Sequence, residues 1–166
     1  AYAFWNSYFS GALSLPVCVE IGGYAFSSSN FIGSLNLPAC TAIGGYAFFN
    51  SNFSGSLSLP LCTYIGDGAF VESNFSGSFN LPLCTYIGQY AFINSNFTGS
   101  LDLPVCEYIG EYAFRNSNFN SITIGANAEL YTNCIGAHSV DFIADYAANN
   151  KKAGTYVWDG QHWIYQ

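Results

Sequence analysis

Residues 55–76 read GSLSLPLCTYIGDGAFVESNFS, and variants of this stretch of 22 residues follow one another along the chain of 166 residues. A fixed period of about 20 to 50 residues is typical of solenoids, in which each repeat is a coil that buries its apolar side chains only against its neighbours. The sequence therefore predicts a solenoid of 22-residue coils. One proline marks each of the five copies, at Pro16, Pro38, Pro60, Pro82 and Pro104.

The apolar positions of one copy predict the walls of a coil. Leu57 and Leu59 flank one polar residue, which is the period of two of a strand with one buried face. Pro60 ends that strand because proline has no N–H to donate to a sheet. Each coil is therefore expected to add one short strand to a parallel sheet. The remaining recurrent apolar positions are expected to line the same core, and in the third coil they include Phe53, Ile65, Ala69 and Phe70.

Glycine also recurs at two positions of the coil. These two positions are expected to be corners that need a positive φ or a close approach of two backbones. No coil has room for a long helix, so at most a 3₁₀ turn is expected around each Tyr-Ala-Phe segment. The two sets are Gly22, Gly44, Gly66, Gly88 and Gly110, and Gly11, Gly33, Gly55, Gly77 and Gly99.

Charge is scarce in this sequence. Only 8% of the residues are charged, the net charge is −7, and no Lys or Arg precedes Arg115. A nucleic-acid or anionic-membrane partner needs clustered basic residues, so both are disfavoured. No apolar run is long enough to span a bilayer, and no basic leader is present. The chain begins at Ala1 and contains no Met, so we expect a mature or excised segment.

The motifs L-x-L-P and I-G-x-Y-A-F, with a fixed Cys, resemble the BspA-like leucine-rich repeats, also called Treponema-type repeats. The resemblance covers residues 1 to about 124, and the tail FIADYAANNKKAGTYVWDGQHW at 142–163 is similar to the ending of many bacterial members. It implies a right-handed leucine-rich-repeat coil, exposed on a cell surface or secreted, that adheres to host or microbial proteins. The family usually has its Cys after Ala-Phe, whereas here it follows the Pro. No residue-level binding site carries over from the family.

Five cysteines share one position of the coil. Their side chains run parallel at the stacking distance of about 4.8 Å, longer than the roughly 3.8 Å between Cβ atoms in a disulfide. A straight row of thiols does not surround a tetrahedral zinc ion either. We therefore expect small buried core residues and no metal or cofactor. The column comprises Cys18, Cys40, Cys62, Cys84 and Cys106, and Cys134 lies outside its register.

An asparagine recurs before a core Phe, at Asn30, Asn52, Asn74, Asn96 and Asn118. Three of these positions form glycosylation sequons, but an amide at a fixed place in every coil more often bonds to the turns of neighbouring coils. Catalysis has little support, because His138 and His162 lie in the tail. The acidic residues of the repeats do not recur at one position. We therefore expect a protein that is not an enzyme.

Tyrosines form two further columns, each next to a core position and so expected to be at least partly exposed. Tyrosine provides a large, rigid contact area with a polar tip, which favours a binding surface. Alternatively, the rings stack on one another and only shield the wall of the coil. The columns comprise Tyr24, Tyr46, Tyr90 and Tyr112, and Tyr64, Tyr86 and Tyr108.

The repeat loses its register after Phe119, so we expect a solenoid over 1–124 and a C-terminal cap over 125–166. Ser139 is expected to N-cap a helix over about 139–153 that Gly154 ends. A hairpin over 155–165 with a two-residue turn at Asp159-Gly160 would pair Tyr156 with Trp163 and place Trp158 on the same face. The aromatic residues either cover the last coil or bind sugars.

The chain starts within a coil, since Tyr2-Ala3-Phe4 aligns with Tyr24-Ala25-Phe26. An open solenoid end exposes core side chains and strand edges, which promotes association. The sequence thus favours a non-enzymatic adhesion or protein-binding module on a cell surface or outside the cell. The alternatives are end-to-end self-assembly into dimers or filaments through the N-terminal end, and carbohydrate binding by exposed aromatic residues.

Overall fold

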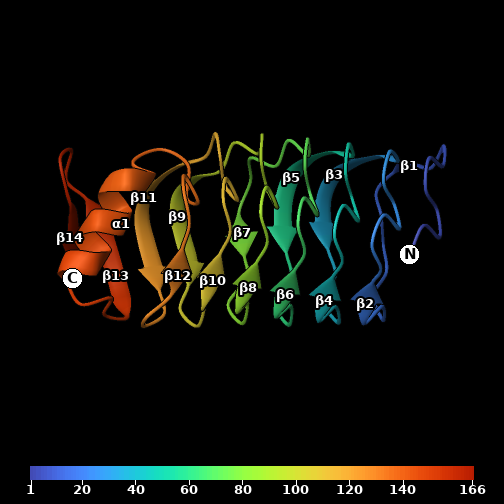
Figure 1. The fold of residues 1–166 in the computed structure, drawn as a ribbon. Helices are drawn as coiled ribbons and strands as arrows, with labels where there is room; N and C mark the ends of the chain where they lie inside the picture. The colour runs from blue at the N-terminus through green and yellow to red at the C-terminus, as the bar shows by residue number, and fades with distance from the viewer.

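The computed structural model describes all residues from Ala1 to Gln166. The coils stack along one axis from the N-terminus to the C-terminal helix, and equivalent strands lie side by side (Figure 1). Each coil has three walls, formed by a longer strand, a short strand and a series of tight turns. The molecule is therefore a β-solenoid of about 6 turns, with the spacing of about 22 residues that the sequence predicts.

Four strands of the first wall, β3, β5, β9 and β11, begin before the predicted Leu-x-Leu segment and include its first apolar residue, whereas β1 and β7 have only two residues each. In β5, Phe53 and Leu57 are buried while Asn52 and Ser54 are exposed, so one face of the strand is part of the core. The parallel sheet β1-β3-β5-β7 is followed by β9 and β11, which pair in parallel with each other. The bounds are β1 (Ser10–Gly11), β3 (Asn30–Asn36), β5 (Asn52–Ser58), β7 (Phe79–Asn80), β9 (Thr98–Leu103) and β11 (Asn118–Ile124).

Short strands form a second parallel sheet, so the expectation of one strand in each coil was wrong. Each has only two residues, as in the pairing of Tyr64 and Ile65 with Tyr86 and Ile87. Two residues are too few to show a periodic pattern in the sequence, and the sheet exists only because neighbouring coils align them. The strands are β2 (Glu20–Ile21), β4 (Ala42–Ile43), β6 (Tyr64–Ile65), β8 (Tyr86–Ile87), β10 (Tyr108–Ile109) and β12 (Glu129–Leu130).

The third wall consists of consecutive hydrogen-bonded turns rather than a 3₁₀ helix. Alternate backbone N–H groups donate to the next coil, as from Tyr46 to the Asp67 carbonyl (2.9 Å) and from Phe48 to the Ala69 carbonyl (2.8 Å). Bonds within a coil, such as that from the Ala47 N–H to the Gly44 carbonyl (3.3 Å), close each turn. The wall therefore satisfies its backbone groups between coils, although it contains no regular strand.

A single apolar core runs through all coils. Phe48 stacks on Phe70 with ring centroids 5.3 Å apart, and Phe53 meets Phe48 edge to face at 5.7 Å. Such aromatic pairs contribute about 0.5–1.5 kcal/mol beyond the burial of their area. A side chain at Gly44 would place its Cβ 2.5 Å from the Gly23 backbone nitrogen, so this corner needs glycine for a close approach of two coils.

The helix α1 (Ser139–Ala148) and the strands β13 (Gly154–Trp158) and β14 (Trp163–Tyr165) lie at the C-terminal end of the solenoid (Figure 1). The strand β13 pairs antiparallel with β11 and β14. The helix ends at Ala148, earlier than the predicted 153, because Asn150 and Lys151 take positive φ angles of 54° and 51°. Its N-cap residue is His138 rather than the predicted Ser139, which is the first helical residue.

The coil path continues beyond the boundary at 124 that the sequence predicts. The strand β12 pairs in parallel with β10, and the Phe114 N–H donates to the Cys134 carbonyl at 2.9 Å. The chain therefore completes one more partial coil, with Cys134 at the position of Ala113 and Ile135 at that of Phe114. The 22-residue period is not visible here because most residues of this last coil differ from the pattern of the others.

Candidate functional site

The first tyrosine column, Tyr64, Tyr86 and Tyr108, stands on the sheet of short strands. Its rings are stacked with centroids 4.9 Å and 4.5 Å apart, and Tyr131 continues the column at 5.1 Å with a tilted ring. Tyr64 and Tyr131 are 43% and 42% exposed, and the two rings between them are half-buried. Tyr131 was missed because it belongs to the partial coil in which the repeat pattern is lost.

The phenols of Tyr86 and Tyr108 are neutral at physiological pH, because their pKa values are raised. Burial is the largest cause that raises the pKa of Tyr86, followed by the negative charge of Asp67. Burial also raises the pKa of Tyr108, together with the neighbouring Tyr131. A protonated hydroxyl both donates and accepts hydrogen bonds, so each ring has an apolar body and a polar tip that suit a protein partner.

An apolar column accompanies these tyrosines and was not predicted. Leu61, Leu83 and Val105 follow the proline of their coils and are 47%, 45% and 44% exposed. The recurrence of an aliphatic residue directly after each of these prolines was the signal that could have identified it. Together, the two columns form a surface that we call the aromatic face, defined by Tyr64, Tyr86, Tyr108, Leu61, Leu83 and Val105.

The second tyrosine column, Tyr24, Tyr46, Tyr90 and Tyr112, lies on the wall of turns, and all four side chains are half-buried. The rings of Tyr24 and Tyr46 stack at 5.2 Å, and those of Tyr90 and Tyr112 at 5.5 Å. All four residues have φ between 55° and 57°, an unusual conformation for a bulky side chain. Gly68 interrupts the column, and a side chain there would place its Cβ 2.5 Å from the Tyr46 ring.

The cysteine column faces the core, and all six thiols of the chain are free. Cys40, Cys62, Cys84 and Cys106 are buried, while Cys18 in the first coil is half-buried. Each thiol of the column donates to the carbonyl two residues further on, as from Cys62 Sγ to the Tyr64 carbonyl at 3.3 Å. Burial raises the pKa of Cys62 and Cys106 to about 12, so these side chains are protonated core residues.

The asparagine column is exposed along its whole length, and its Asn30 and Asn52 amides are 3.4 Å apart in a hydrogen bond between coils. A buried serine column directly before it was missed. The Ser95 hydroxyl donates to the Ser73 carbonyl at 2.9 Å, and Ser117 to the Ser95 carbonyl at 3.1 Å. The sequence contained a signal for this column, because a serine precedes each asparagine of the column from Asn30 onward.

The C-terminal aromatic residues are arranged differently from the prediction. Trp163 pairs with Trp158 rather than with Tyr156, because the hairpin turn contains four residues, Asp159 to His162. Trp163 is only 3% exposed and donates from Nε1 to the His138 carbonyl at 3.3 Å. It is therefore part of the core of the cap. Trp158 is half-buried and stacks on His138 at 4.1 Å.

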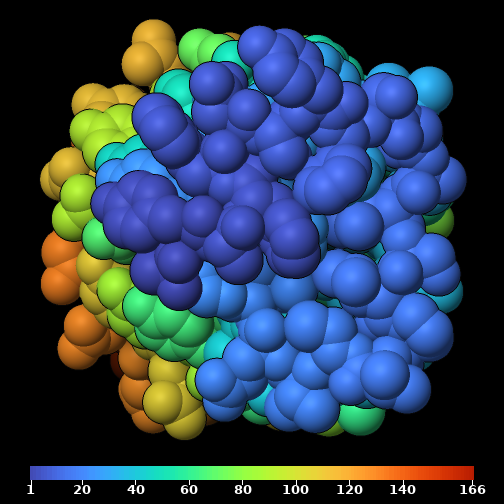
Figure 2. Space-filling model, turned by 90° about the vertical axis from the view of Figure 1, so that its right-hand side faces the viewer, coloured from blue at the N-terminus to red at the C-terminus, as the bar shows by residue number.

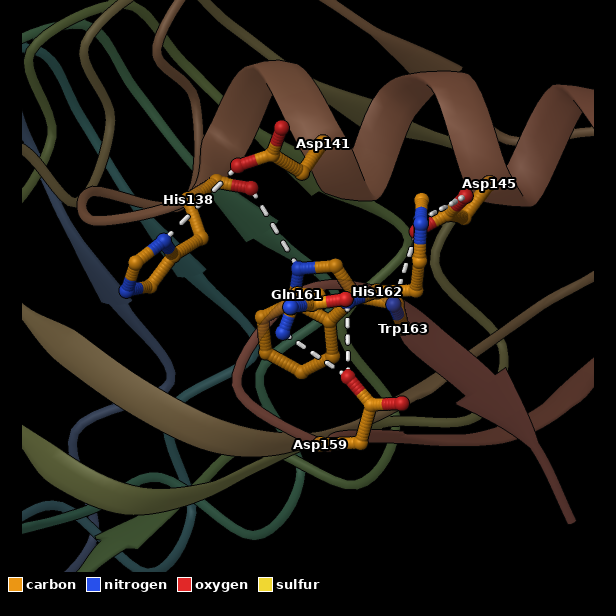
Figure 3. Close-up of polar contacts among 7 residues, drawn as sticks. All are labelled: His138, Asp141, Asp145, Asp159, Gln161, His162 and Trp163. Atoms are coloured by element: carbon orange, nitrogen blue, oxygen red, sulfur yellow. Dashed lines mark hydrogen bonds and ion pairs between the residues drawn. The ribbon is translucent and has the colours of Figure 1, made fainter.

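Polar side chains fasten this hairpin to α1 (Figure 3). Asp145 accepts the Trp163 N–H at 2.7 Å, and its other carboxylate oxygen lies 3.5 Å from His162 Nδ1. Asp159 accepts the N–H groups of Gln161 and His162, both at 2.8 Å, which lowers its pKa. Asp145, Asp159 and His162 thus make contacts that hold the hairpin in place. No three His, Cys, Asp or Glu side chains are grouped so that they could hold a metal ion.

The N-terminal end of the solenoid faces the viewer in Figure 2, and it exposes apolar side chains. Tyr8 and Val17 are 93% and 84% exposed, and Phe4, Leu15 and Phe26 line a shallow hollow on this end. The backbone of residues 1–7 already follows the coil path, since the Phe4 N–H donates to the Ala25 carbonyl at 2.8 Å. The chain contains no helix with the length and hydropathy needed to cross a membrane.

The coils, the continuous core and the columns at equal spacing define a solenoid of the leucine-rich-repeat class. Residues 19–141 match the family model of the BspA type leucine rich repeat region in six copies, and the chain belongs to this family. The repeats of this family are typically non-enzymatic scaffolds that bind proteins, and they are common in surface and secreted proteins. Comparisons with curated proteins and with solved structures found no match.

Proposed function

We propose that this chain is a non-enzymatic adhesion module, displayed on a cell surface or secreted, that binds a partner protein through the aromatic face. The observation that carries the proposal is the continuous stack of Tyr64, Tyr86 and Tyr108 beside exposed aliphatic side chains. Tyrosine, with its rigid ring and polar hydroxyl, is enriched among the residues that dominate binding energy. In most coils a tyrosine of the second column lies four residues after the position of the first column, as Tyr90 does after Tyr86. The second column extends the candidate surface.

The partner is a protein with an apolar, uncharged contact surface. The six side chains that define the aromatic face carry no charge, although acidic residues such as Asp67 lie near it, so apolar and aromatic contacts carry the proposed binding. Long-range steering requires clustered charge, and screening by salt acts mainly on exposed charges. The carbohydrate alternative at the tryptophan hairpin loses support, because Trp163 is buried.

The test is surface plasmon resonance with purified extracellular-matrix and serum glycoproteins, using the wild type and two triple variants. Replacing Tyr64, Tyr86 and Tyr108 with Ser should weaken binding of any partner by at least about tenfold, since hot-spot residues each cost more than about 1 kcal/mol on truncation. The matched control replaces Asn52, Asn74 and Asn96 with Ser on a different wall, where the side chains are also exposed. Equal loss in both variants, or a steep dependence on salt, would reject the aromatic face as the binding surface.

Self-association is a second candidate function, favoured by the exposed apolar residues of the N-terminal end. If the N-terminal ends of two copies contact each other, they form a closed dimer. If the N-terminal end of one copy contacts the C-terminal end of the next, the assembly can continue as a filament. The tail end is covered by α1 and the hairpin, so the closed dimer has the better physical support.

A further inference from the structure

A polar hollow of about 640 Å³ lies where the last full coil meets the cap, away from the aromatic face. Its size falls within the roughly 300–1,000 Å³ of small-molecule sites. The hollow exists because the next coil has only small residues here. Gly136 has a φ of 83°, and a Cβ there would lie 2.3 Å from the Ser117 carbonyl oxygen, so this position needs glycine. The partial coil contributes three residues to the lining of the hollow, which are Asn133, Gly136 and Ala137.

Arg115 gives the hollow its character. It occupies the coil position that holds Phe49, Val71 and Ile93 in the three preceding coils, and it is the only arginine of the chain. Its guanidinium carbon lies 5.5 Å from the centroid of the Tyr112 ring, a cation–π contact that restrains the exposed side chain. No carboxylate forms an ion pair with it, and no acidic residue lines the hollow. A restrained positive charge without a counter-ion is a ready partner for an anion.

Side-chain amides surround this charge. The Asn116 Nδ2 group donates to Asn94 Oδ1 at 2.7 Å, which leaves the Asn116 Oδ1 atom free to accept. The side chains of Asn118 and Asn133 line the same hollow and form no hydrogen bond within the protein. An amide can both donate and accept, which matches the hydroxyl groups of a sugar. The hydrophobic part of the lining is limited to Tyr112 and Ala137, which leaves no pocket for the apolar side chains of a peptide.

We propose that this hollow binds an acidic sugar, such as a terminal uronic acid of a glycan. Arg115 pairs with the carboxylate, and the amides of Asn116, Asn118 and Asn133 bond to the ring hydroxyls. A guanidinium suits this role because its planar fork can form two parallel hydrogen bonds to one carboxylate. The hollow shares Tyr112 with the second tyrosine column but contains none of the six residues of the aromatic face, so either proposal can fail without the other.

The experiment is an NMR titration of the ¹⁵N-labelled chain with glucuronate, glucose, acetate and an N-acetylated Gly-Glu peptide. Glucuronate should bind at least about tenfold more tightly than glucose or acetate, a difference of about 1.4 kcal/mol, and should shift the side-chain amide signals of the three asparagines. The variant Arg115→Ile should lose at least tenfold in affinity while it keeps the fold, because Ile93 occupies the same position one coil earlier.

The matched control is Lys152→Gln, which also removes a positive charge in contact with an aromatic ring. Lys152 Nζ lies 4.3 Å from the centroid of the Tyr165 ring, and Lys152 does not line the hollow. This variant should bind glucuronate as the wild type does. Tighter binding of the peptide than of glucuronate would overturn the proposal in favour of a peptide site. Equal binding of glucose, equal loss in the control, or no binding of glucuronate would also overturn it.

Discussion

Raising the pH above 9 should destabilise this protein through its buried cysteine column. Burial raises the pKa of Cys62 and Cys106 from 9.0 to about 12 in the folded state. Below the lower value both states keep their protons, and the thiols contribute no dependence on pH. Between the two values the unfolded chain loses protons that the folded chain retains, so the free energy of unfolding falls as the pH rises.

The expected effect is large. One pKa unit corresponds to about 1.4 kcal/mol, so each of the two thiols lowers the free energy of unfolding by about 2 kcal/mol between about pH 9 and pH 11. Together they remove about 4 kcal/mol from a total that is typically about 5–15 kcal/mol for a domain. Burial also raises the pKa of Cys84, so the same trend is expected from its thiol.

Urea unfolding followed by tryptophan fluorescence, with a phosphine reductant present, measures this slope at several pH values. The variant Cys62→Ala should show a slope weaker by about 1.4 kcal/mol per pH unit within the window, because one titrating thiol is removed. Its absolute stability also falls through lost packing, so the slopes are compared rather than the stabilities. Ser54→Ala, at an exposed position, serves as the control and should leave the slope unchanged. Identical slopes in wild type and Cys62→Ala would refute the reasoning.

Three further predictions concern the thiols, a corner and the open end. An aromatic thiol reagent should modify Cys18 in the native protein and the other five cysteines only after unfolding, whereas fast native modification of all six would contradict their burial. Gly66→Ala should cost more than about 2 kcal/mol in urea unfolding, because its Cβ would lie 2.6 Å from the Gly45 nitrogen; a cost within about 0.5 kcal/mol would show that the coils can separate there. The 166-residue chain should associate with increasing concentration in light scattering, and a constant mass of 18.0 kDa would rule this out.

The columns could be predicted because a constant repeat length places equivalent residues side by side. The buried Leu57 and Ile65, and the partly exposed tyrosines, lie where the 22-residue period puts them. The aromatic face was predicted only in part, since the exposure of Leu61 depends on the direction in which the chain turns after Pro60. The sequence does not indicate whether the side chain of an apolar residue next to a turn points into the core or toward solvent.

The sequence by itself determined the solenoid, its repeat length and the composition of its walls, because stacking requires only that each coil resemble the next. The tertiary structure alone decided what happens where the repeat breaks down. It paired β12 with β10 in a partial coil where the 22-residue period is lost, and it buried Trp163 against α1 through a turn longer than two residues. It also left a hollow beside Arg115, since the space around a side chain depends on which residues of another coil pack against it, and spacing along one chain does not specify that.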